Sequence, residues 1–332
     1  MILICYGTRP EWLKIKPLIC EFNKCSIKYK TLFTGQHVDI VTSRADFTCS
    51  VNSDSCKNRL NAVMISTLSI PDNIFEDVTH VLVQGDTTSA LGLALNAFNR
   101  GIKIIHLEAG LRTYDQKNPY PEEANRQIIS RITDIHFCPT RDNKANLVNE
   151  LCTGKIYVVG NTSLDNIKNV KTDYKDTVLV TLHRRENHNI IKDWFIEISK
   201  LALKYKKIKF ILPIHPNPNV MKHKHLLEGV EVVQPLPHCD LLDILANCKT
   251  AITDSGGIQE EASFFNKKII VCRKVTERVE SINTHSFICT APSRLNSIFR
   301  QIINNYKTKK SCPYGDGKTS QRISSILKKC IN

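Results

Sequence analysis

Long apolar segments are missing from this sequence of 332 residues. No run approaches the roughly 20 apolar residues that a helix needs to cross a bilayer. The first residues, MILICYGTRPEWLKIKP, carry no basic leader, and Arg9, Pro10 and Glu11 interrupt the apolar stretch too early for a secretory signal. We therefore expect a cytoplasmic protein with no membrane partner. With 42% hydrophobic and 23% charged residues, the composition is that of an ordinary globular protein.

Cysteines at metal-binding spacing are also missing. The 13 cysteines are odd in number, and no two are spaced CxxC. Cys5, Cys138 and Cys272 lie in apolar surroundings, where a thiol behaves as a small hydrophobic group. HExxH and similar metal-ligand patterns are absent from the sequence as well. We expect reduced core thiols and neither a metal ion nor a cofactor.

The basic clusters lack interleaved aromatic residues. Basic residues outnumber acidic ones by 46 to 32, which gives a formal charge of +14. The clusters KYKKIK (204–209) and YKTKK (306–310) do not have the aromatic side chains on which single-stranded nucleic acids stack. The composition therefore favours a small phosphate-bearing ligand over a nucleic-acid partner.

Short apolar runs alternate with amphipathic segments along the whole chain, which predicts parallel sheets with helical crossovers. The runs expected to be strands are 1–6, 30–33, 80–83, 103–106, 135–137, 156–159, 178–181, 210–213, 230–234, 250–253 and 268–272. Helices are expected at 11–23, 88–99, 191–205 and 241–247. A polar stretch at 161–176 is the best linker candidate. The sequence thus predicts an α/β fold of two Rossmann-like, doubly wound domains that face a cleft.

Three loops in the first half carry acidic residues where predicted strands end. Asp86 follows one strand, although it could simply cap the next helix. Glu108 follows the next strand, where an acid costs free energy unless it is paired or used. Glu122 and Glu123 begin a later helix and could merely complement its dipole. Because such loops open at one edge of a parallel sheet, the three acids together indicate a catalytic site.

Basic and glycine-rich loops follow other predicted strands. Gly7-Thr8-Arg9 opens a helix, where Arg9 suits a phosphate, although a solvated arginine is the alternative. His183 and His215 follow strands of the second half, where a histidine can be structural or catalytic. Ser255-Gly256-Gly257 lets backbone amides approach a diphosphate at a helix start. Glu261, one turn later, can accept hydrogen bonds from the two hydroxyls of a ribose. Because GxxxxGK[ST] and GxGxxG are absent, a sugar nucleotide is the favoured ligand.

The order of these motifs resembles a known family. GTRPEWLKIKPL, TGQH, VQGDTTS, HLEAGLRT, PYPEEANR, FCPT, TLHRREN, PIHPNPNV, TDSGGIQEEAS, TERVE and CPYGDG run in order over nearly the whole chain. They are similar to motifs of the non-hydrolysing UDP-N-acetylglucosamine 2-epimerases. The resemblance implies a GT-B-like pair of domains, 1–168 with a final helix at about 317–332, and 169–316 for UDP. It also implies a homodimer.

The family's functional residues are carried over position by position. The resemblance implies Asp86, Glu108, Glu122 and His183 as catalytic residues. It places substrate contacts on Arg9, Lys14, His215, Ser255, Gly256, Gly257 and Glu261, and a possible activator site at Gln36 and His37. Two segments depart from the family: 45–60 lacks the usual longer helical segment, and 236–241 (LPHCDL) lacks the aromatic residues common beside the uracil.

The implied reaction is reversible epimerisation at C2 of a UDP-N-acetylhexosamine, from the gluco to the manno sugar. The C2 proton is barely acidic, so UDP is expected to leave from C1 by anti-elimination as the C2 proton is removed, and to add back to the 2-acetamidoglucal. This chemistry needs a carboxylate on each face of the sugar. A UDP-6-deoxy-L-hexosamine or a UDP-diacetamido-uronic acid is the alternative substrate. A GT-B glycosyltransferase is the enzymatic alternative, and a nucleic-acid-binding protein is the non-enzymatic one.

Overall fold

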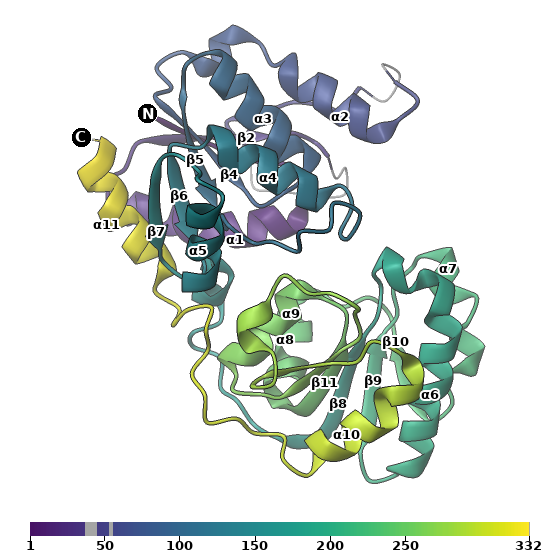
Figure 1. Ribbon diagram of the computed structural model, residues 1–332. Helices are drawn as coiled ribbons and strands as arrows, with labels where there is room; N and C mark the ends of the chain where they lie inside the picture. The colour runs from purple at the N-terminus through teal and green to yellow at the C-terminus, as the bar shows by residue number, and fades with distance from the viewer. Residues whose placement is uncertain (37–44, 53–55, 332) are drawn as a thin grey trace. The chain divides into compact units, whose positions relative to one another are not determined.

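The computed structural model of the protein describes residues 1–36, 45–52 and 56–331 (Figure 1). The chain divides into two compact units. The first comprises Met1–Asn166 together with Gly315–Asn332, and the second comprises Ile167–Tyr314. Each unit contains a parallel sheet flanked by helices, which confirms the predicted α/β fold class. His37, an expected activator-site residue, lies outside the described residues.

Within its described residues, the first unit has a seven-stranded parallel sheet in the order β3-β2-β1-β4-β5-β6-β7. The strands are β1 (Ile2–Tyr6), β2 (Tyr29–Phe33), β3 (Phe47–Thr48), β4 (His80–Gln84), β5 (Lys103–Leu107), β6 (Ile135–Cys138) and β7 (Lys155–Val158). The helices are α1 (Arg9–Lys24), α2 (Arg59–Leu68), α3 (Thr88–Asn99), α4 (Glu122–Ile132), α5 (Arg141–Asn149) and α11 (Thr319–Ile331). Strands β1 to β3 extend the sheet toward one edge, and β4 to β7 extend it toward the other. The strand order therefore reverses between β1 and β4, and ligands bind at such a point in sheets of this kind.

Strand β1 shows why this sheet is buried on both faces. All five of its residues are buried, so the strand reads as a continuous apolar run rather than an alternating one. Ile4 and Tyr6 pack with helices α1 and α11, whereas Leu3 and Cys5 pack with α3 on the opposite face. Successive side chains of a strand point to opposite faces, so one apolar strand contributes to two core layers.

Within its described residues, the second unit has a six-stranded parallel sheet in the order β10-β9-β8-β11-β12-β13. The strands are β8 (Lys175–Thr181), β9 (Lys209–Pro213), β10 (Val230–Val233), β11 (Cys248–Thr253), β12 (Ile269–Val271) and β13 (Ser286–Ile288). The helices are α6 (Ile191–Lys204), α7 (Pro218–Met221), α8 (His238–Asn247), α9 (Gly256–Phe264) and α10 (Leu295–Ile303). Trp194, Phe195 and Phe299 of α6 and α10 pack with Val178 and Val180 of β8.

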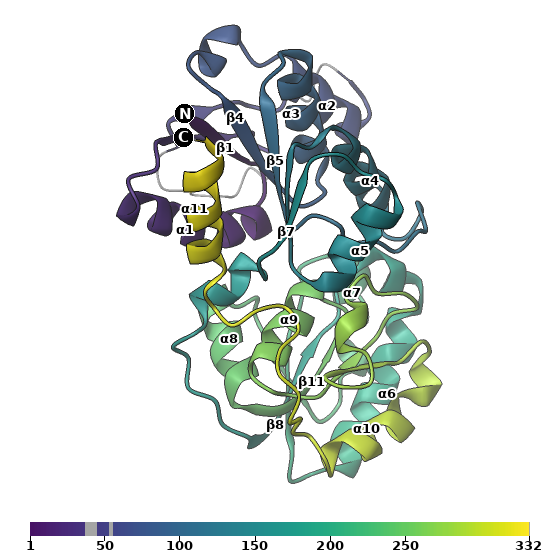
Figure 2. The ribbon, with the colours of Figure 1, turned by 60° about the vertical axis from the view of Figure 1, so that its left-hand side comes forward.

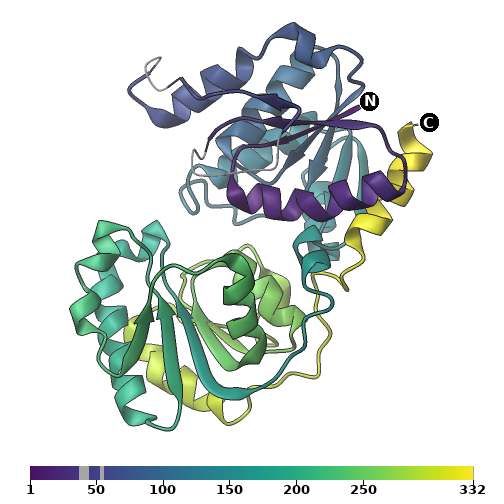
Figure 3. The ribbon, with the colours of Figure 1, turned by 180° about the vertical axis from the view of Figure 1, so that it is seen from behind.

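Helix α11 returns to the first unit after the second unit is complete. Its Ile323 and Leu327 join the apolar cluster of α1, and the yellow helix packs across the purple one (Figure 2 and Figure 3). The carboxylate of Asp165 accepts hydrogen bonds from the first backbone amides of this helix, Thr319 N at 2.9 Å and Ser320 N at 2.6 Å. These contacts satisfy amides that a helix start leaves without intrahelical partners.

The elements agree with the sequence expectations where apolar runs are long. Helix α3 was expected at 88–99 and has those bounds, whereas α8 begins three residues earlier than expected, at His238. The short strands β3 and β13 were not anticipated. Cys5, Cys138 and Cys272 are buried as predicted. Among the described residues, no helix combines the length and the apolarity needed to cross a membrane.

The first prediction concerns Gly110, which has φ +86° and whose added β-carbon would lie 2.2 Å from the carbonyl oxygen of Asn143. Gly101 has a similar φ of +69° but open space around it. Gly101→Ala should cost about 1–2 kcal/mol for the left-handed backbone. Gly110→Ala should cost about 1–3 kcal/mol more, because its neighbours must move. Urea unfolding of the two variants measures the difference, and equal losses would contradict it.

The second prediction concerns His106, a fully buried residue of β5 whose Nε2 lies 2.8 Å from the carbonyl oxygen of Gly85. Burial lowers the pKa of His106 from 6.5 to about 3. Between these values the unfolded chain takes up a proton on this ring and the folded chain does not. The fold should therefore lose about 1.4 kcal/mol per pH unit as the pH falls below 6.5 toward 3.

The matched variant for this test is His106→Gln, whose amide can still donate to Gly85. Its free energy of unfolding should fall less steeply with acidification than that of the wild type. The measurement is urea unfolding of both proteins at pH 7, 6 and 5. If the free energy of unfolding fell equally with pH in the two proteins, the pKa of His106 would not be lowered by folding.

Candidate active site

The loops after β4 and β5 bring two of the expected catalytic acids to one edge of the first sheet. Gly85 N donates to the carbonyl oxygen of Leu107 at 3.0 Å, so the two strands stay paired to their ends. Asp86 and Glu108 are the residues that follow directly. Helix α4, which begins with Glu122, is tied to the same edge because the side-chain amide of Asn125 donates to the Asp86 carbonyl oxygen at 2.8 Å.

Glu108 is buried and held by three donors. Its Oε2 accepts hydrogen bonds from the ammonium of Lys14 and the amide of Gln84. Its Oε1 accepts from Nδ2 of Asn161 at 3.0 Å. Glu108 also has φ +66°, a left-handed conformation that is uncommon for a residue with a side chain. The cost of burying this acid, noted from the sequence, is offset by a cation and two amides.

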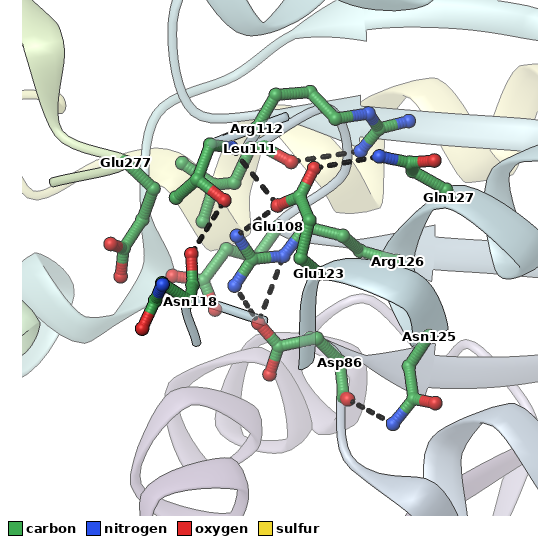
Figure 4. Close-up of polar contacts among 12 residues, drawn as sticks. Asp86, Glu108, Leu111, Arg112, Asn118, Glu123, Asn125, Arg126, Gln127 and Glu277 are labelled. Carbon is green, nitrogen blue, oxygen red and sulfur yellow. Dashed lines mark hydrogen bonds and ion pairs between the residues drawn. The ribbon is translucent and has the colours of Figure 1, made fainter. Parts of the chain in front are cut away.

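Asp86 forms an ion pair with Arg126 of α4 and does not cap helix α3. Its Oδ2 accepts from Nε of Arg126 at 3.1 Å and from a second guanidinium nitrogen (Figure 4). The cap of α3 is Thr87, whose hydroxyl accepts from Ala90 N at 3.1 Å. The alternative reading of Asp86 as a helix cap is therefore wrong.

The two glutamates at the start of α4 differ in their surroundings. Glu123 is fully buried, accepts from the backbone amides of Thr113 and Tyr114 at 2.9 and 3.1 Å, and pairs with Arg126 at 3.0 Å. Figure 4 shows this carboxylate enclosed by its donors. Glu123 thus shapes the loop before α4, whereas Glu122 is partly exposed in the first turn of that helix.

The loop after β1 is organised by Glu11. Its Oε2 accepts from the amides of Gly7 and Thr8 at 2.7 and 2.6 Å, and its Oε1 accepts from the hydroxyl of Thr87 at 2.6 Å. Burial raises the pKa of Glu11 above its ordinary value. This residue joins the loop that carries Arg9, which is exposed at the start of α1, to the loop that carries Asp86.

Gln36 lies beside the same edge of the first sheet. Its Oε1 accepts a hydrogen bond from the backbone amide of Ser89 at 3.2 Å, and its carbonyl oxygen accepts from Arg59 of α2 at 2.9 Å. These contacts connect the loop after β2 to the starts of α2 and α3. Gln36 is therefore a neighbour of the loop that follows β4.

In the second unit, the glycine-rich turn after β11 opens helix α9. Ser255 stands at the cap position, and its side chain makes no capping bond. A β-carbon on Gly256 would lie 2.9 Å from the guanidinium carbon of Arg278, so glycine permits the close approach of that arginine. The amides of Gly256 and Gly257 lie at the start of this helix, where backbone N–H groups without intrahelical partners can bind an anion.

Asp254 fixes the loop that follows β8. It is fully buried and accepts hydrogen bonds from the backbone amides of His183 at 3.0 Å and Arg184 at 2.9 Å, and from Nδ2 of Asn187 at 2.9 Å. The ring of His183 stacks on that of His215, with 5.7 Å between centroids and 25° between planes. Burial, followed by the charges of His183 and His188, lowers the pKa of His215.

A network of arginines and acids supports the glycine-rich turn. Arg278 pairs with Glu260 at 2.9 Å and with Glu277, and Arg273 pairs with Glu277 at 2.9 Å. Arg184 lies 3.9 Å from Glu277. The motifs TERVE and TLHRREN drew attention to these segments in the sequence. Local patterns did not indicate which of their arginines and acids would form ion pairs.

Glu261 is buried in the second turn of α9, and its Oε1 lies 2.9 Å from Nε2 of His238. The expected residues therefore form two groups. Asp86, Glu108, Glu122, Lys14, Arg9 and Gln36 lie in the first unit, and His183, His215, Ser255, Gly256, Gly257 and Glu261 lie in the second. Across the described part of the chain, no group of three histidine, cysteine, aspartate or glutamate residues could hold a metal ion.

Known proteins resemble this chain over its whole length. The sequence model of a family described as UDP-N-acetylglucosamine 2-epimerase matches residues 21–328. The UDP-N-acetylglucosamine 2-epimerases of Campylobacter jejuni and Salmonella borreze are 35% and 33% identical and cover 100% and 97% of this chain, which spans 98% and 96% of theirs.

Solved structures agree with the sequence relatives. The crystal structure of UDP-GlcNAc 2-epimerase from Neisseria meningitidis bound to UDP-GlcNAc superposes with a TM-score of 0.88 at 31% identity and covers 99% of each chain. Family match, full-length relatives and fold therefore lead to one conclusion: this chain belongs to the UDP-N-acetylglucosamine 2-epimerase family of isomerases.

Proposed function

We propose that the protein interconverts UDP-N-acetylglucosamine and UDP-N-acetylmannosamine without net hydrolysis. The observation that carries the proposal is the acidic cluster of the first unit, defined as Asp86, Glu108 and Glu122 at the edge formed by β4, β5 and α4. A glycosyltransferase does not need three acids in one place. The relative from Neisseria meningitidis, whose structure was solved with UDP-GlcNAc bound, supports the choice of sugar nucleotide.

The reaction proceeds by elimination and re-addition. The C2 carbon of an N-acetylhexosamine bears no carbonyl group, so a carboxylate cannot remove its proton while the sugar stays intact. Departure of UDP from C1 as the C2–H bond breaks gives a 2-acetamidoglucal. Addition of a proton to the opposite face of C2, with return of UDP to C1, produces the epimer. One proton is removed from C2 and one is added to it, and UDP returns to C1, so the reaction has no net consumption of another reactant.

Glu108 and Glu122 transfer the protons, and Asp86 orients them. The ammonium of Lys14 and the amides of Gln84 and Asn161 hold the Glu108 carboxylate in a fixed orientation, as a group that transfers a proton must be. The ion pair with Arg126 holds Asp86 in place, which suits an orienting role better than proton transfer. Glu122 is partly exposed in the first turn of α4 and can serve the opposite face.

The second unit binds UDP and stabilises it as it leaves. The amides at Gly256 and Gly257, together with the positive end of α9, suit the diphosphate, where negative charge develops. His183 donates to the departing phosphate, with His215 stacked on it, and Arg9 of the first unit adds a permanent positive charge. Glu261 accepts the ribose hydroxyls. Residues 36 and 37 remain the proposed activator site, and the homodimer implied by the resemblance remains a proposal that sedimentation would test.

The third prediction tests the acidic cluster. Glu108→Gln and Glu122→Gln should each lower kcat by about 10²–10⁴, because each removes a group that transfers a proton in the transition state. Proton NMR of UDP-N-acetylglucosamine with each variant measures the rate. Glu76→Gln, at an exposed position before β4, is the control and should keep wild-type activity. A Glu122→Gln variant of near wild-type rate would remove Glu122 from the mechanism.

The fourth prediction tests elimination itself. In deuterium oxide, the wild-type protein should place solvent deuterium at C2 of the manno product, because the proton removed from one face is replaced from the other. The loss of the H2 signal in the NMR spectrum reports this exchange. Epimer formed with its C2 proton retained would exclude the mechanism. A panel of UDP-6-deoxy-hexosamines and UDP-uronic acids in the same assay identifies the preferred sugar.

A further inference from the structure

The contact between Glu261 and His238 adds a residue that the expected site did not include. His238 is the first residue of α8 and follows β10, whereas Glu261 lies in α9 and follows β11. The two side chains meet at 2.9 Å, from His238 Nε2 to Glu261 Oε1, although 23 positions separate them in the sequence. The His238 side chain is 28% exposed and that of Glu261 is 6% exposed.

The helices that carry the two residues pack against each other, so the contact is built into the fold. Helices α8 and α9 touch, and α8 also packs on strands β8 and β11. Both helices begin at the carboxyl edge of the second sheet, beside the glycine-rich turn. Within the described chain, His238 is the side chain that hydrogen-bonds the Glu261 carboxylate.

A carboxylate offers about four acceptor positions on two oxygens. The imidazole N–H of His238 occupies one position on Oε1 and stops rotation about the end of the side chain. The remaining positions can accept hydrogen bonds from two neighbouring hydroxyl groups. Because the group is already fixed and largely desolvated, binding a diol costs less ordering than with a freely rotating glutamate.

We propose that His238 is a positioning residue for the nucleotide: it orients the Glu261 carboxylate toward the 2′- and 3′-hydroxyls of the ribose. This inference rests on the proposed binding of UDP by the second unit. The preference for a ribonucleotide then depends on both residues: Glu261 contacts the ribose, and His238 acts by orienting Glu261. It also gives a function to the 236–241 segment, which lacks the expected aromatic residues.

The experiment compares UDP with 2′-deoxy-UDP by isothermal titration calorimetry. The wild type should bind UDP roughly tenfold or more tightly than 2′-deoxy-UDP, because a hydroxyl bonded to a carboxylate is a strong contact. His238→Leu should lower this ratio by about three- to tenfold through loss of orientation. His238→Gln, which can still donate an N–H, should restore most of the ratio. A purely structural role would lower both affinities equally and leave the ratio unchanged.

Two further variants make the test specific. Glu261→Gln should lower the ratio by itself, and adding His238→Leu to it should have no further effect, because His238 acts through Glu261. His225→Leu, at an exposed histidine of the same unit, is the matched control and should leave the ratio at the wild-type value. Thermal melting of each variant confirms that it is folded, and the Gln variants carry the test should His238→Leu not fold.

The possible failures are distinguishable. A wild type that binds no UDP would overturn the proposed function and this inference with it. A wild type that binds UDP but does not prefer it over 2′-deoxy-UDP would overturn the inference alone. An unchanged ratio in His238→Leu, or a further drop when His238→Leu is added to Glu261→Gln, would likewise show that His238 does not act through Glu261.

Discussion

Both groups of site residues depend on a buried carboxylate that accepts hydrogen bonds from the backbone. In the first unit Glu11 accepts from the amides of Gly7 and Thr8 and from the hydroxyl of Thr87. In the second unit Asp254 fixes the loop after β8 in the same way. A buried charge is tolerated only when several donors surround it. Each loop is therefore held in one conformation before any ligand arrives, which is what electrostatic catalysis requires.

Charge is arranged differently in the two units. In the first, acids meet single fixed cations: Glu108 faces Lys14, and Asp86 faces Arg126. In the second, Arg273 and Arg278 near the glycine-rich turn are both paired with Glu277. The first arrangement suits proton transfer at a sugar ring. The second suits a diphosphate, because amides and a positive helix end stabilise its negative charge.

Local patterns in the sequence were sufficient for the longer strands and for the position of Glu108 at a strand end, because these follow from apolar periodicity and parallel topology. They could not show that Thr87 and not Asp86 caps helix α3, since both residue types favour the cap position. Nor could they identify Arg126 as the partner of Asp86, or His238 as that of Glu261, because 40 and 23 residues separate these pairs. Contacts of this kind are set by how helices pack, which no short window of sequence records.

The return of α11 to the first unit affects the order in which the two units can complete their folding. In the sequence, Ile167–Tyr314 come after the first unit's sheet and before α11, the helix that packs on α1. On the ribosome, the apolar side of α1 that receives Ile323 and Leu327 therefore stays uncovered while the whole second unit is synthesised. The second unit, which is continuous in the chain, can reach its final packing first. The unit that begins at the N-terminus is thus the later one to be completed during translation.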